Sequence, residues 1–228
     1  MFLYGEKMLI AIITGAGRGI GREIARALDI RELDEIWAIF PNKNALQALY
    51  ANMKTPVRIL ACNLYDLNAL TAIKDELKES HPKVKYLIHT EGLFSKENAI
   101  LEEEASCRGA VALTEIVKPY MHKKGRILFA VPMENFFENI SADKLASADF
   151  LCAYGRALHN NLAKSDVNVT VAIVEKEYAE EAAVRRALRA LEANIEVLTP
   201  SWKSLFYRII KNILPRKFFL RLKNSHNS

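Results

Sequence analysis

A glycine-rich segment near the N-terminus has the residue types and spacing of a phosphate-binding turn. The segment TGAGRGIG spans Thr14–Gly21; it follows the apolar run LIAII and precedes the helical pattern REIARAL. Its glycines are Gly15, Gly17, Gly19 and Gly21. Glycine permits positive φ angles and lets backbone N–H groups approach a pyrophosphate, which the N-terminus of a helix also attracts. The segment therefore predicts a nucleotide site; the alternative is a glycine-rich turn that binds no ligand.

Around this turn, apolar runs alternate with helical patterns along most of the chain. The predicted strands are Leu9–Thr14, Glu35–Phe40, Val57–Ala61, Lys85–His89, Arg126–Val131 and Val169–Val174. The predicted helices are Gly19–Leu28, Asn44–Asn52, Asp66–Ser80, Glu102–His122, Ala142–Lys164 and Glu177–Ala193. This alternation predicts an α/β fold, a Rossmann-like doubly wound parallel sheet with helices on both faces.

Length and composition fit one domain in a reducing compartment. The chain has 228 residues, of which 50% are hydrophobic, enough to bury one sizeable core. No apolar run approaches the roughly 20 residues that span a bilayer, and the first residues do not resemble a secretory signal. The cysteines, Cys62, Cys107 and Cys152, lie far apart, and the histidines do not cluster. This pattern predicts a cytoplasmic protein without a structural metal.

The basic charge is concentrated at the C-terminal end. The net charge is +5, but residues 200–228 hold seven Lys and Arg and no Asp or Glu. The preceding residues are nearly balanced, with 25 basic and 27 acidic side chains, so the chain is not predicted to bind nucleic acid. We therefore divide it into a dinucleotide-binding domain, residues 1–199, and a basic extension of the same domain, residues 200–228.

Within the extension, residues 201–223 have the pattern of a basic amphipathic helix. One apolar stripe consists of Leu205, Phe206, Ile209, Ile210, Ile213 and Leu214. Lys203, Arg208 and Lys211 fall largely off this stripe, and Pro215 ends the helix. The pattern predicts packing on the domain or on a second subunit; the alternative is a peripheral location at an anionic membrane surface.

The glycine segment also resembles the T-G-x-x-x-G-x-G motif of the short-chain dehydrogenase/reductase family. The resemblance runs in order from Leu9 to about Val174: Asn63–Leu64 correspond to the family's Asp-hydrophobic pair, and HTEG, residues 89–92, to its Asn-Ala-Gly turn. KPYM and GRIL, residues 118–121 and 125–128, resemble its helix end and fifth strand. The resemblance implies dinucleotide contacts at Gly15, Gly17, Arg18, Gly19, Ile20, Gly21, Asn63, Leu64, Glu91 and Gly92.

The second predicted strand bears on which dinucleotide binds. Proteins that bind NAD place a carboxylate at the end of this strand, where it binds the ribose hydroxyls. This chain has Phe40–Pro41 there. Arg18 matches the family position that favours the 2′-phosphate of NADP, and Lys43 is a second cation nearby. The sequence favours NADP over NAD without excluding NAD.

The residues with which the family transfers a hydride are missing. The family needs a Ser at the end of strand five, a Tyr-x-x-x-Lys pair on the next helix, and an Asn on the preceding helix. The Ser position holds Pro132 and the Asn position Ser106. The Tyr and Lys positions hold Lys144 and Ala148 in one register, or Cys152 and Arg156 in another. We therefore assign no catalytic residue and predict a degraded active site.

Two other interpretations stay open. An active oxidoreductase on a small carbonyl or alcohol would need substitute acid–base groups, for which Lys144 or a His89–Glu91 pair are the candidates. A membrane-surface or scaffold protein would act through residues 201–223. The family commonly dimerises through the helices that carry Ser106 and Ala148, so the resemblance also implies a homodimer.

Overall fold

The computed structural model of the chain describes residues 7–29, 31–51, 53–64, 66–90, 99–133, 142–175 and 181–199. The predicted amphipathic segment 201–223 lies outside these residues. Within them, no helix is both long enough and apolar enough to cross a bilayer.

In the described part of the chain, the centre of the fold is a seven-stranded sheet in which every neighbouring pair of strands is parallel. The strand order is β3-β2-β1-β4-β5-β6-β7. The strands are β1 Leu9–Thr14, β2 Glu35–Ile39, β3 Val57–Leu60, β4 Lys83–His89, β5 Met121–Met133, β6 Asn168–Glu175 and β7 Val197–Leu198. This order confirms the predicted doubly wound sheet.

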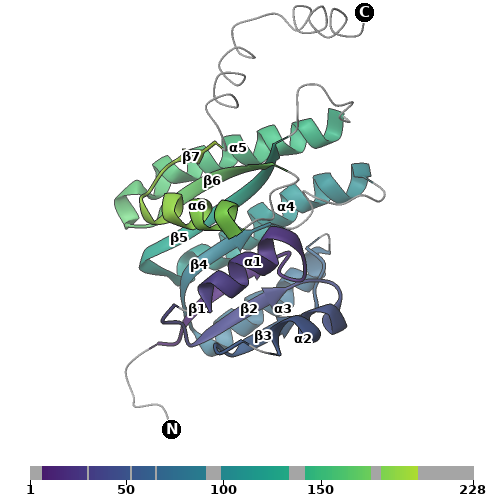
Figure 1. Ribbon diagram of the computed structural model, residues 1–228, viewed down its shortest axis with the longest axis vertical. Coiled ribbons are helices and arrows are strands. Elements are labelled where there is room, and N and C mark those ends of the chain that lie inside the picture. Colours follow the sequence, from purple (N-terminus) through teal and green to yellow (C-terminus); the bar gives the residue numbers. More distant parts are fainter. Residues whose placement is uncertain are drawn as a thin grey trace, which may run out of the picture.

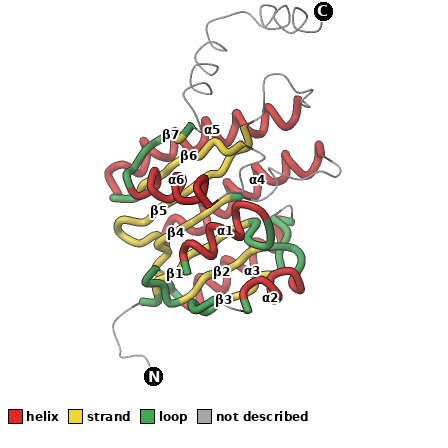
Figure 2. Tube along the Cα trace, in the orientation of Figure 1, coloured by secondary structure: helices red, strands yellow, loops and turns green. Residues whose placement is uncertain are grey.

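Helices cover both faces of the sheet (Figures 1 and 2). One face carries α1 Gly19–Leu28, α2 Lys43–Tyr50 and α6 Glu181–Glu192. The other carries α3 Leu67–Ser80, α4 Ala99–Val117 and α5 Ala142–Leu162. Short 3-10 turns, η1 Lys118–Tyr120 and η2 Ala163–Ser165, follow α4 and α5.

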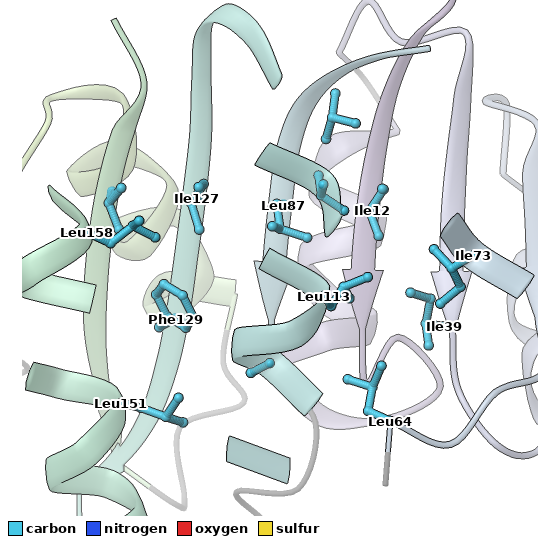
Figure 3. Packing of buried hydrophobic residues seen from close by; sticks show 14 of the residues in the cluster. Ile12, Ile39, Leu64, Ile73, Leu87, Leu113, Ile127, Phe129, Leu151 and Leu158 are labelled. Carbon is cyan, nitrogen blue, oxygen red and sulfur yellow. The ribbon is translucent and has the colours of Figure 1, made fainter. Parts of the chain in front are cut away.

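The central strands are apolar on both faces because each face is buried under helices. In β1, Ile10 and Ile12 belong to the core under α3, α4 and α5, whereas Ala11 and Ile13 belong to the core under α1, α2 and α6. Successive strand residues point to opposite faces, so a continuous apolar run serves both cores. Figure 3 shows the first of these cores, with Leu87 and Phe129 of the sheet among the labelled residues.

The sheet order reverses at β1, which lies between β2 and β4. The chain leaves β1 toward α1 on one face, and it leaves β4 toward α4 on the other. The connections therefore diverge beyond the carboxyl ends of these two strands. In a doubly wound sheet, ligands bind in the crevice at this switch point.

Two expectations about the elements were wrong. The helix predicted to run to His122 ends at Val117, and Met121 and His122 belong to β5. Pro119 explains the early end, because proline lacks an N–H and its ring clashes with the preceding helical turn. The two-residue strand β7 was not predicted, because it is too short to show a period.

We expect Phe129 to be a major contributor to stability. It is 1% exposed, and its ring lies between His89, stacked at 4.9 Å, and Tyr154, edge-on at 5.7 Å. Phe129→Ala should lower the free energy of unfolding by about 3–5 kcal/mol in a urea titration. Phe150→Ala is the matched control, because Phe150 is 49% exposed; it should cost about 1 kcal/mol or less. Equal losses for the two variants would contradict this assignment of the core.

Candidate functional site

The turn between β1 and α1 requires glycine for its backbone conformation at two positions. Gly15 has φ 67° and Gly19 has φ 53°. Residues with a Cβ rarely adopt this left-handed region, whereas glycine enters it without steric cost. The turn is closed by an N–H···O hydrogen bond from Arg18 to Gly15, with an N···O distance of 3.4 Å.

The other two glycines of the turn are required by close packing. A Cβ on Gly17 would lie 2.3 Å from Cδ1 of Phe40. A Cβ on Gly21 would lie 2.4 Å from Oγ1 of Thr90 and 2.5 Å from the carbonyl oxygen of Gly15. Each of the four glycines is therefore required by the structure. Two of them are required by contacts with residues outside the segment, Phe40 and Thr90.

Helix α1 presents an uncapped N-terminus at this turn. Its N-cap residue, Arg18, makes no side-chain capping hydrogen bond, and its first turn contains no acidic residue. The first N–H groups of a helix have no partner within the helix, and they carry the positive end of the helix dipole. Ile20 is 4% exposed and anchors this end of the helix in the core. The arrangement can hold a phosphate or pyrophosphate by its backbone N–H groups.

A pair of threonines joins the ends of β1 and β4. The N–H of Thr90 donates to Oγ1 of Thr14 at 3.1 Å, and the Thr90 hydroxyl donates to the Thr14 carbonyl oxygen at 2.6 Å. Both residues are at least 95% buried. Thr90 was not among the predicted site residues; the only signal in the sequence is a threonine at or directly after the end of each of these two strands.

A tyrosine from α2 supports the turn from one side. The Tyr50 hydroxyl donates to the carbonyl oxygen of Ala16 at 2.5 Å, and burial raises the pKa of this hydroxyl. The sequence predicts no site role for Tyr50, because its hydrogen-bond partner is 34 residues away. The contact ties α2 to the middle of the glycine turn.

Arg18 and Phe40 stand side by side where a dinucleotide would place its adenosine ribose. The Arg18 guanidinium lies 6.0 Å from the centroid of the Phe40 ring, a cation–π distance. Arg18 itself is exposed. The end of β2 thus presents an aromatic face to the turn, with a cation beside it. Phe40 offers no carboxylate to a ribose hydroxyl, whereas Arg18 offers a guanidinium to a 2′-phosphate.

The remaining predicted cofactor contacts have different places in the structure. Leu64 follows β3, is 2% exposed, and packs so closely on α4 that a Cβ on Gly109 would lie 2.5 Å from the Leu64 carbonyl oxygen. Asn63, beside it, is half-buried, and its carbonyl oxygen accepts a hydrogen bond from the Asp66 N–H. Glu91 and Gly92 lie outside the described residues.

His89, at the end of β4, is enclosed in the core. It is 3% exposed, and its Nε2 lies 3.0 Å from the Thr114 hydroxyl, which itself donates to the Ala110 carbonyl oxygen. The hydroxyl therefore accepts from Nε2–H, and Nδ1 is left buried with no protein partner among the described residues. Burial lowers the pKa of His89 to about 3. The ring is neutral at physiological pH.

Tyr154, on α5, is committed to packing between helices. Its hydroxyl lies 3.2 Å from Oε1 of Glu115 on α4, to which it donates. Burial, and then the Glu115 carboxylate, raise the pKa of this hydroxyl. A tyrosine that serves as a proton donor needs a lowered pKa near the reacting group, so this environment is opposite to a catalytic one.

The residues that the sequence comparison placed at the family's catalytic positions lie on β5 and α5. Pro132 lies at the end of β5, paired with Val174 of β6. Ala148 is 7% exposed and belongs to the core, and Cys152 is half-buried on the same helix. Lys144 lies in the first turn of α5. Within the described part of the chain, no three His, Cys, Asp or Glu side chains gather closely enough to hold a metal ion.

The sheet order and the glycine turn at its switch point define a doubly wound α/β protein of the Rossmann type. A family model described as short chain dehydrogenase matches residues 9–190. The chain therefore belongs to the short-chain dehydrogenase family. No curated protein sequence matches it significantly.

Solved structures of this family share the fold at low sequence identity. A putative short-chain dehydrogenase from Novosphingobium aromaticivorans is 16% identical with a TM-score of 0.71, over 97% of this chain and 95% of that one. A metagenomic short-chain oxidoreductase in complex with NADP is 20% identical with a TM-score of 0.67, over 85% and 95%. L-sorbose reductase from Gluconobacter frateurii, complexed with NADPH and L-sorbose, is 17% identical with a TM-score of 0.61, over 74% and 70%.

The packing of Gly17 against Phe40 can be tested by a double-mutant cycle. Gly17→Ala should lower the free energy of unfolding by about 1–3 kcal/mol, because the new methyl group overlaps the Phe40 ring. In a Phe40→Ala background most of that cost should disappear, a coupling of about 1 kcal/mol or more measured by urea titration.

Gly19→Ala is the control for this cycle, because a Cβ there has open space but a strained φ of 53°. It should cost about 1–2 kcal/mol equally in both backgrounds. If Phe40→Ala rescued both variants alike, the specific contact would be disproved.

The environment of His89 predicts a pH dependence of stability. The unfolded chain takes up a proton on this residue below about pH 6.5, whereas the folded chain does so only near pH 3. The free energy of unfolding should therefore fall as the pH drops from about 6.5 toward 3, by up to about 1.4 kcal/mol per pH unit. Urea titrations from pH 8 to pH 4 should show this slope in the wild type and a smaller one in His89→Gln.

The control for this pH experiment is His81→Asn, a change at an exposed residue whose φ of 44° suits asparagine. This variant should keep the wild-type slope. Equal slopes in the wild type and His89→Gln would show that His89 titrates normally.

Proposed function

We propose that this member of the short-chain dehydrogenase family binds NADP(H) at the β1–α1 turn and transfers a hydride slowly or not at all. The observation that carries the proposal is the contrast between two neighbouring strand ends. The end of β1 leads into a complete glycine turn with an uncapped helix, whereas the end of β5 holds Pro132.

Dinucleotide binding is supported by the geometry of the turn. The positive φ angles of Gly15 and Gly19 keep the backbone compact, and the uncapped start of α1 directs N–H groups to the crevice. The metagenomic relative was solved with NADP and the sorbose reductase with NADPH, in the same fold. A phosphate-binding role accounts for these features together.

The preference for NADP is supported by the pair at the end of β2. Arg18 is exposed beside the Phe40 ring and can form charge-assisted hydrogen bonds to a 2′-phosphate. The adenine or ribose of the cofactor would contact an aromatic face instead of a carboxylate. NAD lacks the 2′-phosphate and would gain nothing from Arg18.

Weak catalysis is supported by the state of the candidate proton donors. General acid catalysis typically contributes about 10²- to 10⁴-fold to a rate, so its loss leaves a slow reaction. His89 is neutral and buried, and the Tyr154 hydroxyl is engaged with Glu115. Neither can deliver a proton to a carbonyl oxygen in the crevice without leaving its partners.

The competing function is an active oxidoreductase on a small carbonyl or alcohol substrate that uses substitute residues. Burial weakens the His89–Glu91 pair as the donor, since His89 faces Thr114 of α4. Lys144, in the first turn of α5, is the stronger candidate by position. A lysine could donate a proton if burial lowered its pKa.

The two functions are separated by cofactor titration and a turnover screen. Titration of NADPH and NADH, followed by nucleotide fluorescence, should give tighter binding of NADPH. Arg18→Ala should raise the Kd for NADPH about tenfold or more and leave that for NADH within about threefold, because only the phosphate contact is lost. Arg22→Ala is the matched control, since Arg22 is already paired with Glu23 at 2.9 Å.

The screen follows NADPH oxidation with a panel of aldehydes and ketones. Robust turnover that Lys144→Ala abolishes would overturn the degraded-site proposal and establish the active alternative. Failure of both nucleotides to bind would overturn the cofactor assignment itself.

Two further parts of the proposal concern partners. A homodimer through α4 and α5 is supported by the resemblance to the family, whose members commonly dimerise through these helices. For residues 201–223 we favour packing on the domain or on a second subunit; the alternative is contact with a membrane surface and a peripheral location in the cytoplasm. Both rest on the sequence pattern of this segment.

A further inference from the structure

A cavity of about 380 Å³ lies at the edge of the sheet opposite the glycine turn. It forms where η1 leads from α4 into β5 and where η2 leads from α5 toward β6. Parallel strands all begin at the same edge, and the β1–α1 turn lies at the other. Figure 1 shows α5 crossing the sheet, so that its last residues lie on the far side of the molecule from that turn. The cavity is therefore separate from the dinucleotide crevice.

The lining of this cavity combines apolar and basic side chains. Met121, Leu162 and Val167 contribute apolar surface, whereas Lys118, His122 and Lys123 contribute nitrogen donors. Among the described residues, no aspartate or glutamate lines it. Small-molecule sites commonly combine an apolar wall with a few polar groups, in volumes from roughly 300 Å³ upward. This lining suits an anion that carries a small apolar group.

A large bulge in β5 brings two of the basic residues to the cavity. Met121 pairs with Val84 and Arg126 pairs with Tyr86, so a single residue of β4 faces the segment from His122 to Gly125. Within this segment Lys124 has φ 64°. Bulges reorient side chains at the ends of strands and next to binding sites. Here the bulge takes His122 and Lys123 out of the regular ladder.

The three basic residues differ in whether they already form ion pairs or hydrogen bonds within the protein. Lys118 is held by Glu115, with N···O distances of 3.0 and 2.7 Å. Lys123 is exposed and takes part in no ion pair within the described ranges. Nδ1 of His122 is buried with no hydrogen-bond partner there. Buried polar atoms in proteins are nearly always paired. Turning the His122 ring toward the cavity would break no hydrogen bond at Nδ1 and would allow this atom to form one.

From these contacts we infer that the cavity binds a small amphipathic carboxylate. The carboxylate oxygens accept hydrogen bonds from Lys123 and His122, and a short hydrocarbon chain packs against Met121, Leu162 and Val167. Charge-assisted hydrogen bonds supply the preference for an anion, and the apolar wall supplies the preference for a chain over inorganic phosphate.

The test is isothermal titration of the full chain with octanoate, 1-octanol and inorganic phosphate. Octanoate should bind at least about tenfold more tightly than either of the others, because it alone offers both features. Lys123→Gln and His122→Phe should each weaken octanoate binding about tenfold and leave the Kd for NADPH unchanged. Lys124→Gly is the matched control, since it removes the neighbouring charge at a φ that glycine favours; it should leave octanoate binding unchanged.

Several results would overturn this inference. Undetectable octanoate binding at millimolar concentration, or equal affinity for 1-octanol or phosphate, would disprove amphipathic recognition. Equal losses in Lys123→Gln and Lys124→Gly would show that diffuse surface charge attracts the ligand. Competition between octanoate and NADPH would place the carboxylate in the dinucleotide crevice. Circular dichroism of each variant confirms that it is folded.

Discussion

The close approach of three backbone segments at the carboxyl end of β1 is the constraint on which the candidate site depends. Gly21 of α1 lies against the Gly15 carbonyl group and the Thr90 hydroxyl, with no room for a Cβ. The same hydroxyl donates to the carbonyl oxygen of Thr14, so one side chain holds β4 beside β1 and limits how far α1 can move away. The start of α1 is therefore set relative to two strands at once.

Near the carboxyl ends of β4 and β5, the aromatic side chains are used for packing. His89 stacks on Phe129 and bonds to Thr114, and Tyr154 meets the same phenylalanine edge-on while donating to Glu115. These contacts join β4, β5, α4 and α5 into one aromatic cluster. Burial favours the neutral form of the histidine and of the tyrosine at neutral pH. The glycine turn and this aromatic cluster thus depend on different strands, the turn on β1 and the cluster on β4 and β5.

The two edges of the sheet offer different chemistry for a physical reason. At the carboxyl edge, helix N-termini provide N–H groups for phosphates. At the amino edge, the ends of α4 and α5 must turn back into strands, and Pro119 together with the β5 bulge makes that return irregular enough to leave a cavity. Solved relatives at 16–20% identity share the sheet and the helices. Their substrates do not carry over, because specificity resides in side chains that such identity does not conserve.

The sequence by itself determined the class of fold, the bounds of β1 and α1 to the residue, and the position of the glycine turn between them. These features are local: an apolar run, a helical period and glycines in succession are visible without knowing what they contact. It also showed that Pro132 cannot supply a hydroxyl. Only the tertiary structure decided why Gly17 and Gly21 are glycines, since Phe40 and Thr90 come from other strands. Likewise, the partners of Thr90 and Tyr50 lie 76 and 34 residues away, and no period or motif connects such pairs before the chain folds. The burial of His89 is likewise decided by the tertiary structure, because the sequence shows a histidine at a strand end but does not show which helix covers it.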